Sequence, residues 1–269
     1  MAADPMPDTT AVAGEAPGRV VLGRYRGLIT PGEECDFDYG GFPLPDGGFW
    51  RYREPDAVVV VEHNRLRVAV HPLTRSHDRV QILDNAKNMY FSKATVVVPQ
   101  SGQVGVEAEM SARIVDGHDD DLYAGFVSLH LLDLSTGLAF DWFVANRKAA
   151  TVYARLRFPG VEPTDEDDPA RPRYFCVFHE CDRPLSTGER HRYGVAYDRD
   201  ADTVRFARDG EEIDVYPHVP VKMDQFMVAL GVMTEKTLGE KGSVSLFGQG
   251  VVAEWSEVTV DGAAGLRGV

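Results

Sequence analysis

The chain has 269 residues, of which 43% are hydrophobic and 10% aromatic, so it can bury a core of its own. Its formal net charge is −14 and its Lys and Arg residues form no cluster, which excludes a surface built to follow the phosphates of nucleic acid. No apolar run is long enough to span a membrane, and the first residues lack the basic and apolar segments of a secretory signal. We therefore expect neither nucleic acid nor membrane as a partner, and a cytoplasmic location.

Nearly the whole chain is predicted to be strand and turn. Residues 1–18 are rich in Ala, Pro, Asp and Thr without periodicity, which predicts a disordered tail. Beyond them, runs rich in Val, Ile, Phe, Tyr and Thr alternate with turn signals such as Asp209-Gly210, and no helical stripe exceeds two turns. The predicted strands are 57–62, 66–70, 94–98, 104–114, 124–132, 138–144, 151–158, 174–178, 191–197, 203–207, 226–234 and 254–260.

Regularly spaced strands without helices indicate an all-β fold, a two-sheet antiparallel β-sandwich. We expect a single domain over residues 19–262, followed by a short C-terminal tail at 263–269. The acidic, Pro-rich segment 161–173 interrupts the strand pattern, and we expect it to form a loop over one sheet.

The cysteines and the acidic residues give no strong metal signal. Cys35, Cys176 and Cys181 are an odd number in a long chain, which favours free thiols over a disulfide framework. The run of three aspartates at 119–121 could contribute to a calcium site, although calcium takes six to eight oxygens and a solvated acidic turn is the favoured interpretation. We expect no metal and no cofactor.

Four segments match, in chain order, a known pattern of strands. They are QVGVEAEMSARI at 103–114, GFVSLHLLD at 125–133, HRYGVAYDRDADTVRFARDGEEI at 191–213 and EWSEVTVDG at 254–262. They resemble, respectively, the strands YGYFEARIK and PAFWLL, the hairpin HTYAIEWTPDKIRFYVDGKLV and the closing strand VDYVRVY of concanavalin A-like glucanases of the laminarinase type. The resemblance covers roughly residues 35–262. It implies a jelly roll of two curved antiparallel sheets whose concave sheet forms a ligand cleft.

The chain departs from that family at its catalytic strand. The segment GLAFDWFVAN at 137–146 takes the place of the strand that carries the motif E-x-D-x-E. Position by position, the three acids fall on Ala139, Asp141 and Phe143, so only the middle Asp is kept. A retaining glycosidase needs two carboxyl groups about 5 Å apart. The resemblance therefore implies the cleft without the chemistry of conventional glycoside hydrolysis.

Alternation along the strands predicts which side chains face the cleft, because successive residues point to opposite faces of a sheet. We assign Trp142 and Trp255 to the core, together with aliphatic sets such as Val127, Leu129 and Leu131 or Val152 and Ala154. The remaining side chains form a mixed apolar and polar surface. The predicted cleft residues are Phe126, Ser128, His130, Asp141, Phe143, Thr151, Tyr153 and Arg155, with Met227 and Met233 from a late strand and Trp50 as a lid.

A mainly apolar surface with a few polar groups is typical of a small-molecule pocket. We predict a non-hydrolytic enzyme, a cyclase, isomerase or lyase, acting on a small, largely apolar substrate in secondary-metabolite biosynthesis. In this prediction His130, Asp141 and Tyr153 are catalytic and move protons, and the other cleft residues bind the substrate.

Three alternatives stay open. One is a carbohydrate-binding, lectin-like protein, as the resemblance suggests. Another is a polysaccharide lyase, since jelly-roll lyases similar to this fold use a Tyr and a His, although QIL at 81–83 stands where they carry Gln-Ile-His. The last is purely structural: His130 and Tyr153 pack or form hydrogen bonds, and Asp141 forms only a cross-strand ion pair with Arg155.

The first prediction concerns the missing carboxylates. The protein is expected to release no reducing sugar from β-glucans, because Ala139 and Phe143 can act neither as nucleophile nor as acid. A reducing-sugar assay beside an active glucanase measures this. Robust hydrolysis that disappears in Asp141→Ala would contradict the alignment, and another acid such as Glu180 would then have to supply the chemistry.

Overall fold

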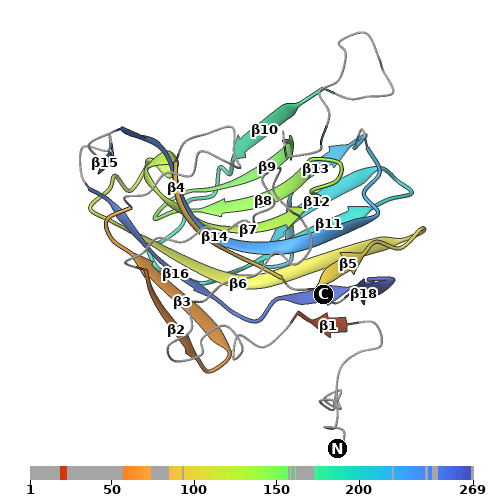
Figure 1. Cartoon of the computed structure of the whole chain (residues 1–269), viewed down its shortest axis with the longest axis horizontal. Coiled ribbons are helices and arrows are strands. Elements are labelled where there is room, and N and C mark those ends of the chain that lie inside the picture. The colour runs from red at the N-terminus through yellow and green to blue at the C-terminus, as the bar shows by residue number, and fades with distance from the viewer. Residues whose placement is uncertain are drawn as a thin grey trace, which may run out of the picture.

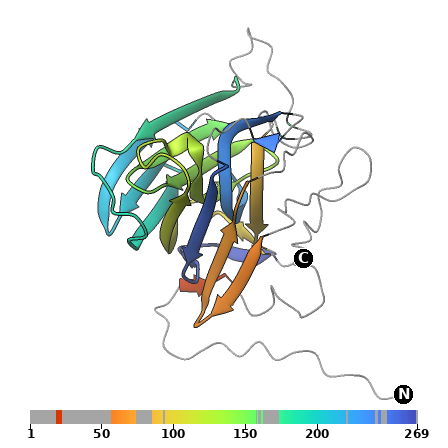
Figure 2. The same cartoon turned by 90° about the vertical axis from the view of Figure 1, so that its left-hand side faces the viewer.

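A computed structural model describes residues 19–22, 57–73, 85–92, 94–156, 158, 161, 173–219, 221–239, 242–243 and 248–267. Trp50, Cys35, the predicted tail 1–18 and most of the predicted loop 161–173 lie outside these residues. The described chain folds into two antiparallel sheets that pack face to face (Figures 1 and 2). The predicted all-β, two-sheet antiparallel sandwich is confirmed.

The first sheet is built around the longest strand of the amino-terminal half, β6. Its strands, in spatial order, are β13 (Glu211–Pro217), β12 (Thr203–Arg208), β11 (His191–Asp198), β6 (Gln103–Val115), β16 (Gly250–Trp255), β3 (Arg65–Val70) and β2 (Val58–Glu62). β17 (Thr259–Asp261) also pairs with β6, and β1 (Arg19–Val21) pairs with β17.

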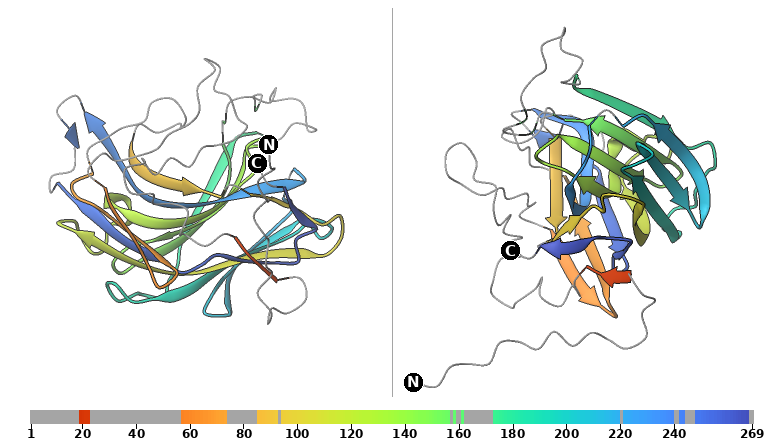
Figure 3. Two further views of the ribbon diagram at one scale, coloured as in Figure 1. Left: turned by 60° about the horizontal axis from the view of Figure 1, so that its bottom comes forward. Right: turned by 90° about the vertical axis from the view of Figure 1, so that its right-hand side faces the viewer.

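The second sheet carries the strand that replaces the glucanase motif. Its order is β10 (Phe175–Glu180), β9 (Ala149–Arg155), β8 (Leu138–Val144), β7 (Phe126–Leu132), β14 (Gln225–Gly239), β5 (Thr95–Val97) and β18 (Gly265–Arg267). β4 (Asn85–Phe91) and β15 (Gly242–Ser243) pair with β14. Residues 265–267, which the sequence places in a C-terminal tail, thus form a strand on β5. Figure 3 shows that the second sheet is concave on the side turned away from the first.

The two sheets bury their sides differently. Along β6, buried and more exposed residues alternate, so one face is in the core and the other meets solvent. In β7, β8 and β9 every residue is buried, which means that both faces of the second sheet are covered there. In β9 small or apolar side chains stand on both faces, so composition alone does not distinguish its core face from its outer face.

Two tryptophans fix the sheets to each other. Trp142 of β8 is fully buried, donates a hydrogen bond from Nε1 to the carbonyl of Gly194 on β11 at 2.9 Å, and packs edge-on against Tyr193. Trp255 of β16 donates to the carbonyl of Ser128 on β7 at 3.1 Å. The predicted core positions of both tryptophans are confirmed. Since Trp142 faces the first sheet, its neighbours Asp141 and Phe143 face away from it.

Helices contribute little to the part of the chain that is described. A single 3₁₀ turn, η2 (Leu122–Ala124), is present there, capped by the Asp121 side chain, which accepts a hydrogen bond from the Tyr123 amide at 3.0 Å. None of the helices among the described residues has the length and apolar character needed to cross a membrane.

Candidate functional site

A chain of three polar side chains lies on the outer face of the second sheet, the face turned away from the first. His130 of β7 stands directly opposite Asp141 of β8 in the antiparallel register. The His130 Nδ1 atom is 2.9 Å from Asp141 Oδ1, and His130 Nε2 is 2.6 Å from Ser128 Oγ. Ser128 in turn donates a hydrogen bond to the carbonyl of Gly231 on β14 at 3.1 Å. We call Ser128, His130 and Asp141 the relay.

The relay is buried, and one of its oxygens is not satisfied by a well-aligned donor. Ser128 is fully buried, and His130 and Asp141 are each only 4% exposed. Asp141 Oδ1 accepts no hydrogen bond of good geometry from any residue that the structure describes, although His130 Nδ1 lies at ion-pair distance from it. An unsatisfied buried polar group costs roughly 1–3 kcal/mol and more when it is charged. A buried polar group of this kind calls for an explanation.

Aromatic rings form one wall beside the relay. Phe126 stacks on Phe143 with ring centroids 4.1 Å apart, and the edge of His130 meets Phe143 at 5.9 Å. Phe143 also contacts Phe178 of β10, and Phe178 stacks on Tyr123 at 5.4 Å. Tyr123 is 43% exposed. The row of rings therefore runs from the buried relay to the protein surface.

Small and flexible side chains share the same face. Across β14, Ala229 stands opposite His130 and Gly231 opposite Ser128. The same register places Met227 opposite Leu132 and Met233 opposite Phe126, so both methionines lie on the outer face as the sequence predicts. Phe126, Ser128, His130, Asp141 and Phe143 are likewise brought together on this face as predicted.

Tyr153, Thr151 and Arg155 do not join this face, and their predicted positions in the cleft are wrong. The register pairs Asp141 with Val152, whereas Tyr153 stands opposite the core residue Phe140. Tyr153 packs between the sheets against Phe140, and burial raises the pKa of its hydroxyl to about 12. The prediction fails because the outer face of β9 carries alanines and a valine, whereas the larger side chains of β9 lie on its other face.

The other two residues of β9 are engaged on the core side as well. Thr151 hydrogen bonds with Asp214 at 2.5 Å and with Tyr216, both from β13 of the first sheet. Arg155 donates from Nε to the carbonyl of Thr136 at 3.0 Å. The alternative in which Asp141 pairs with Arg155 is therefore wrong, because the described ion pair of Asp141 is with His130.

Cys176 belongs to the outer face and was not among the predicted site residues. It stands opposite Ala154 in the β10–β9 register, on the same side as Phe178 and Asp141. Partial desolvation, followed by the negative charges of Asp141 and Glu235, raises the pKa of its thiol. Strand alternation in the sequence shows that Cys176 and Phe178 share one face of β10 and that Val177 lies on the other. Which of these faces is the outer one follows only from the register of β10 with β9.

The acidic run at 119–121 is tied to the protein itself. Asp119 accepts a hydrogen bond from Asn146 at 2.7 Å, and Asp121 pairs with Lys236 at 2.8 Å. Among the described residues no group of three or more His, Cys, Asp and Glu side chains is arranged to hold a metal ion.

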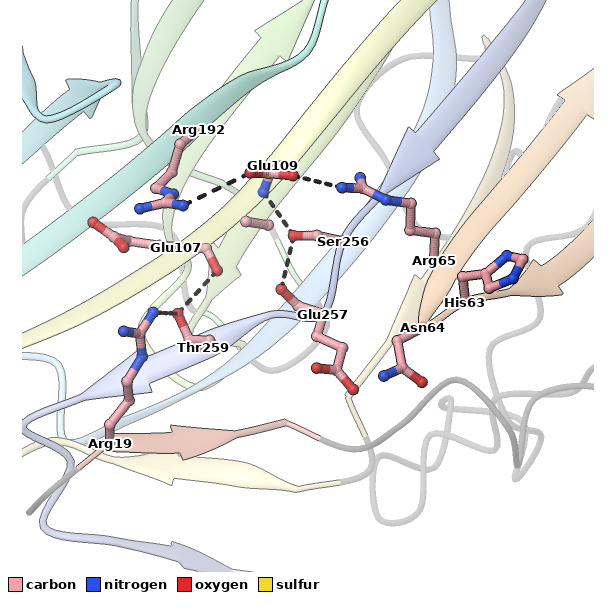
Figure 4. A pocket seen from close by; sticks show the side chains of 11 residues that line it. Arg19, His63, Asn64, Arg65, Glu107, Glu109, Arg192, Ser256, Glu257 and Thr259 are labelled. Atoms are coloured by element: carbon pink, nitrogen blue, oxygen red, sulfur yellow. Dashed lines mark hydrogen bonds and ion pairs between the residues drawn. The ribbon is translucent and has the colours of Figure 1, made fainter. Parts of the chain in front are cut away.

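A hollow lies on the outer face of the first sheet (Figure 4). It has a volume of about 380 Å³ and opens where the chain leaves β16 before returning as β17. At its floor Glu109 lies between Arg65 at 2.7 Å and Arg192 at 3.7 Å, and the hydrogen bond from Arg65 lowers the pKa of Glu109. These charges largely neutralise one another at a solvated surface, where such pairs contribute little. The relay, by contrast, is buried among apolar side chains.

Comparison with sequences of known families gives one match. A family described as "Family of unknown function (DUF6081)" matches residues 34–264. No curated protein sequence matches the chain.

Solved structures of similar shape share little sequence with the chain. The alginate lyase AlgAT5 from Polysaccharide Lyase family 7 is 10% identical with a TM-score of 0.47, over 81% of this chain and 90% of the lyase. The carbohydrate recognition domain of Emp47p is 14% identical with a TM-score of 0.46, over 81% and 91%. An endo-1,3-beta-glucanase from Streptomyces sioyaensis is 14% identical with a TM-score of 0.44, over 72% and 75%. A sialidase is 11% identical with a TM-score of 0.43, over 78% of this chain. The chain spans only 16% of the length of that sialidase.

The second prediction tests whether Asp141 is ionised and faces Cys176. Asp141→Asn removes a negative charge that raises the pKa of the Cys176 thiol, so that pKa should fall. At pH 8 the thiolate fraction then grows, and iodoacetamide should alkylate Cys176 about two- to tenfold faster. Peptide mass spectrometry after timed labelling measures the rate at each cysteine separately.

Cys181 is the internal control for this measurement. Burial and then Asp214 raise the pKa of its thiol to about 11, without a contribution from Asp141. Its labelling rate should stay the same in Asp141→Asn. Faster labelling of both cysteines would report unfolding, and an unchanged rate at Cys176 would show that Asp141 does not act on it.

Proposed function

We infer the function from the site itself, because the chain belongs to a family of unknown function, DUF6081. We propose that it is an enzyme that moves a proton on a small, largely apolar molecule bound at the outer face of the second sheet, with Asp141 as the acid–base group. The observation that carries the proposal is the contact between His130 and Asp141, a buried pair at 2.9 Å whose carboxylate oxygen has no well-aligned donor.

The geometry favours Asp141 over the other two members of the relay. Both ring nitrogens of His130 already face protein groups, Nε2 the Ser128 hydroxyl and Nδ1 the Asp141 carboxylate. Ser128 is fully buried and its hydroxyl proton is directed to the Gly231 carbonyl. Only the carboxylate has a second oxygen with which to meet a bound molecule. His130 and Ser128 therefore hold and polarise Asp141 from behind.

A single carboxylate of this kind is sufficient for a proton transfer that begins and ends on the same group. Asp141 takes a proton from one atom of the bound molecule and returns it to another, with no net change in the enzyme, as an isomerase or cyclase requires. The apolar wall around it lowers the local dielectric constant, so the charge of Asp141 acts strongly on a bound molecule. The rings of Phe126 and Phe143 supply contact area and orientation.

The lining supports a small apolar ligand. Phe126, Phe143 and Met233 stand beside the relay, and small side chains occupy the neighbouring positions of β8, β9 and β14. The lyase alternative, by comparison, needs a Tyr next to the His. Tyr153 points into the space between the sheets, so that pair is not assembled from the residues that the sequence suggested.

A second candidate is carbohydrate binding at the same face. It is favoured by Tyr123, which is 43% exposed and stacks on Phe178 at the end of the aromatic row. An exposed ring backed by a second ring is a rigid apolar surface on which a sugar could lie. In this case Asp141 would serve as a hydrogen-bond acceptor and no proton would be transferred.

The third prediction separates these functions. Small molecules that co-purify with the protein are identified by mass spectrometry and returned to fresh protein in D₂O. Proton transfer predicts deuterium at a carbon of the bound molecule, and Asp141→Asn should slow this exchange by about 10²–10⁴-fold. Glu107→Gln is the matched carboxylate control, because Glu107 lines the hollow on the first sheet, and it should exchange at the rate of the unmodified protein.

The outcome decides between the candidates. A molecule that binds without exchange in the unmodified protein supports carbohydrate or other ligand binding and contradicts the enzymatic proposal. Equal exchange in Asp141→Asn and in the unmodified protein would remove Asp141 from the mechanism.

A further inference from the structure

Gly231 lies against the relay on the neighbouring strand β14. A β-carbon added to it would lie 2.7 Å from Ser128 Oγ and 3.4 Å from His130 Nε2. The first distance is shorter than real β-carbon contacts allow, whereas the second is an ordinary van der Waals contact. Met89 Cγ on β4, at 3.3 Å, would have to give by a few tenths of an ångström. Ser128 Oγ therefore occupies the room that a side chain at residue 231 would take.

Backbone conformation does not explain this glycine. Gly231 is absent from the residues with a positive φ, and it sits in a regular antiparallel register between β4 and β7. A glycine inside a strand packs nothing and usually marks a close approach of another group. Here the approaching groups are the hydroxyl of Ser128 and the ring of His130.

We propose that Gly231 is a positioning residue that fixes where the proton of the relay resides. Its carbonyl oxygen can only accept, so the Ser128 hydroxyl donates to it, and Ser128 Oγ is left to accept from His130 Nε2–H. With a hydrogen on Nε2, an unprotonated Nδ1 would face an ionised carboxylate oxygen at 2.9 Å, which repels. A proton is therefore carried by His130 Nδ1 or by Asp141, although the Nδ1–Oδ1 contact is not a well-aligned hydrogen bond.

The biological purpose of this arrangement rests on the proposed function, in which Asp141 is the reacting carboxyl group. The backbone carbonyl of Gly231 on β14 would then set where the proton near that carboxyl group lies. The physical content of the inference stands apart from any substrate. A side chain at position 231 should push Ser128 Oγ away, break its bond to the carbonyl and release His130 Nε2 from its role as donor.

The fourth prediction is read by nuclear magnetic resonance of ¹⁵N-labelled histidine at neutral pH, without ligand. The unmodified protein should show a protonated Nε2 for His130, assigned by its loss in His130→Gln. In Gly231→Ala that signal should shift or divide between tautomers. Gly105→Ala is the matched control, because Gly105 also lies in a strand, β6, but an added β-carbon meets nothing within 4 Å, and it should leave the His130 signals in place.

A second measurement covers the case in which Gly231→Ala is too unstable to study. Removing the hydroxyl in Ser128→Ala/Gly231→Ala makes room for the new methyl group, so the double variant should melt at a higher temperature than Gly231→Ala alone. Unchanged His130 signals in a folded Gly231→Ala protein, or a double variant whose losses simply add, would overturn the inference. Neither measurement uses turnover, so a failed enzyme assay leaves this test intact.

Discussion

The contact between His130 and Asp141 is the interaction on which the functional account depends. It joins β7 to β8 on the outer face of the second sheet, where the two residues stand opposite each other in the register. Burying a charged pair is expensive, and its mutual attraction offsets the loss of water only when the geometry is good. Here one carboxylate oxygen is left without an aligned donor. A hydrophobic pair would stabilise the sheet at least as well, which is the reason to look for a chemical role.

The charged side chains on the two outer faces of the sandwich lie in different surroundings. On the first sheet, the buried Glu254 lies within 2.6 to 3.3 Å of Arg65, Arg67 and Arg190, whose side chains are partly exposed to water and salt. On the second sheet, the described charges near the relay are few and are surrounded by rings and methyl groups. Equal charges act more strongly in the second setting, because the effective dielectric constant is lower there.

Sequence patterns predict the fold well because strand alternation and turn residues recur along the whole chain. The burial pattern of β6 is a direct case, with one face apolar and the other charged. The same patterns also place Ser128, His130 and Asp141 on one face, since the large aliphatic and indole side chains of β7 and β8 leave no doubt about their core side. They fail for β9. There both faces are apolar, and the aliphatic set Val152 and Ala154 looks like a core face although it lies outside.

The pairing register of the strands shows which face of β9 points outward, which alternation alone does not. Val144 pairs with Ala149, so the hairpin loop holds four residues and the position of every side chain on β9 follows from that number. Cys176 is missed for the same reason, since its face depends on the pairing of β10 with β9. Gly231 is missed because a sequence gives no sign of what lies opposite a glycine. Cys176 and Gly231 come from two different strands, β10 and β14, and only the folded sheet places them on the same face as Asp141.

A high-resolution crystal structure of the protein with a co-purified or soaked molecule tests the central claim most directly. The account predicts that the molecule lies on the outer face of the second sheet, between Phe143 and Met233, with one of its atoms within hydrogen-bond distance of the Asp141 carboxylate. A molecule held instead in the hollow at Glu109, with the relay unchanged and out of its reach, would contradict it.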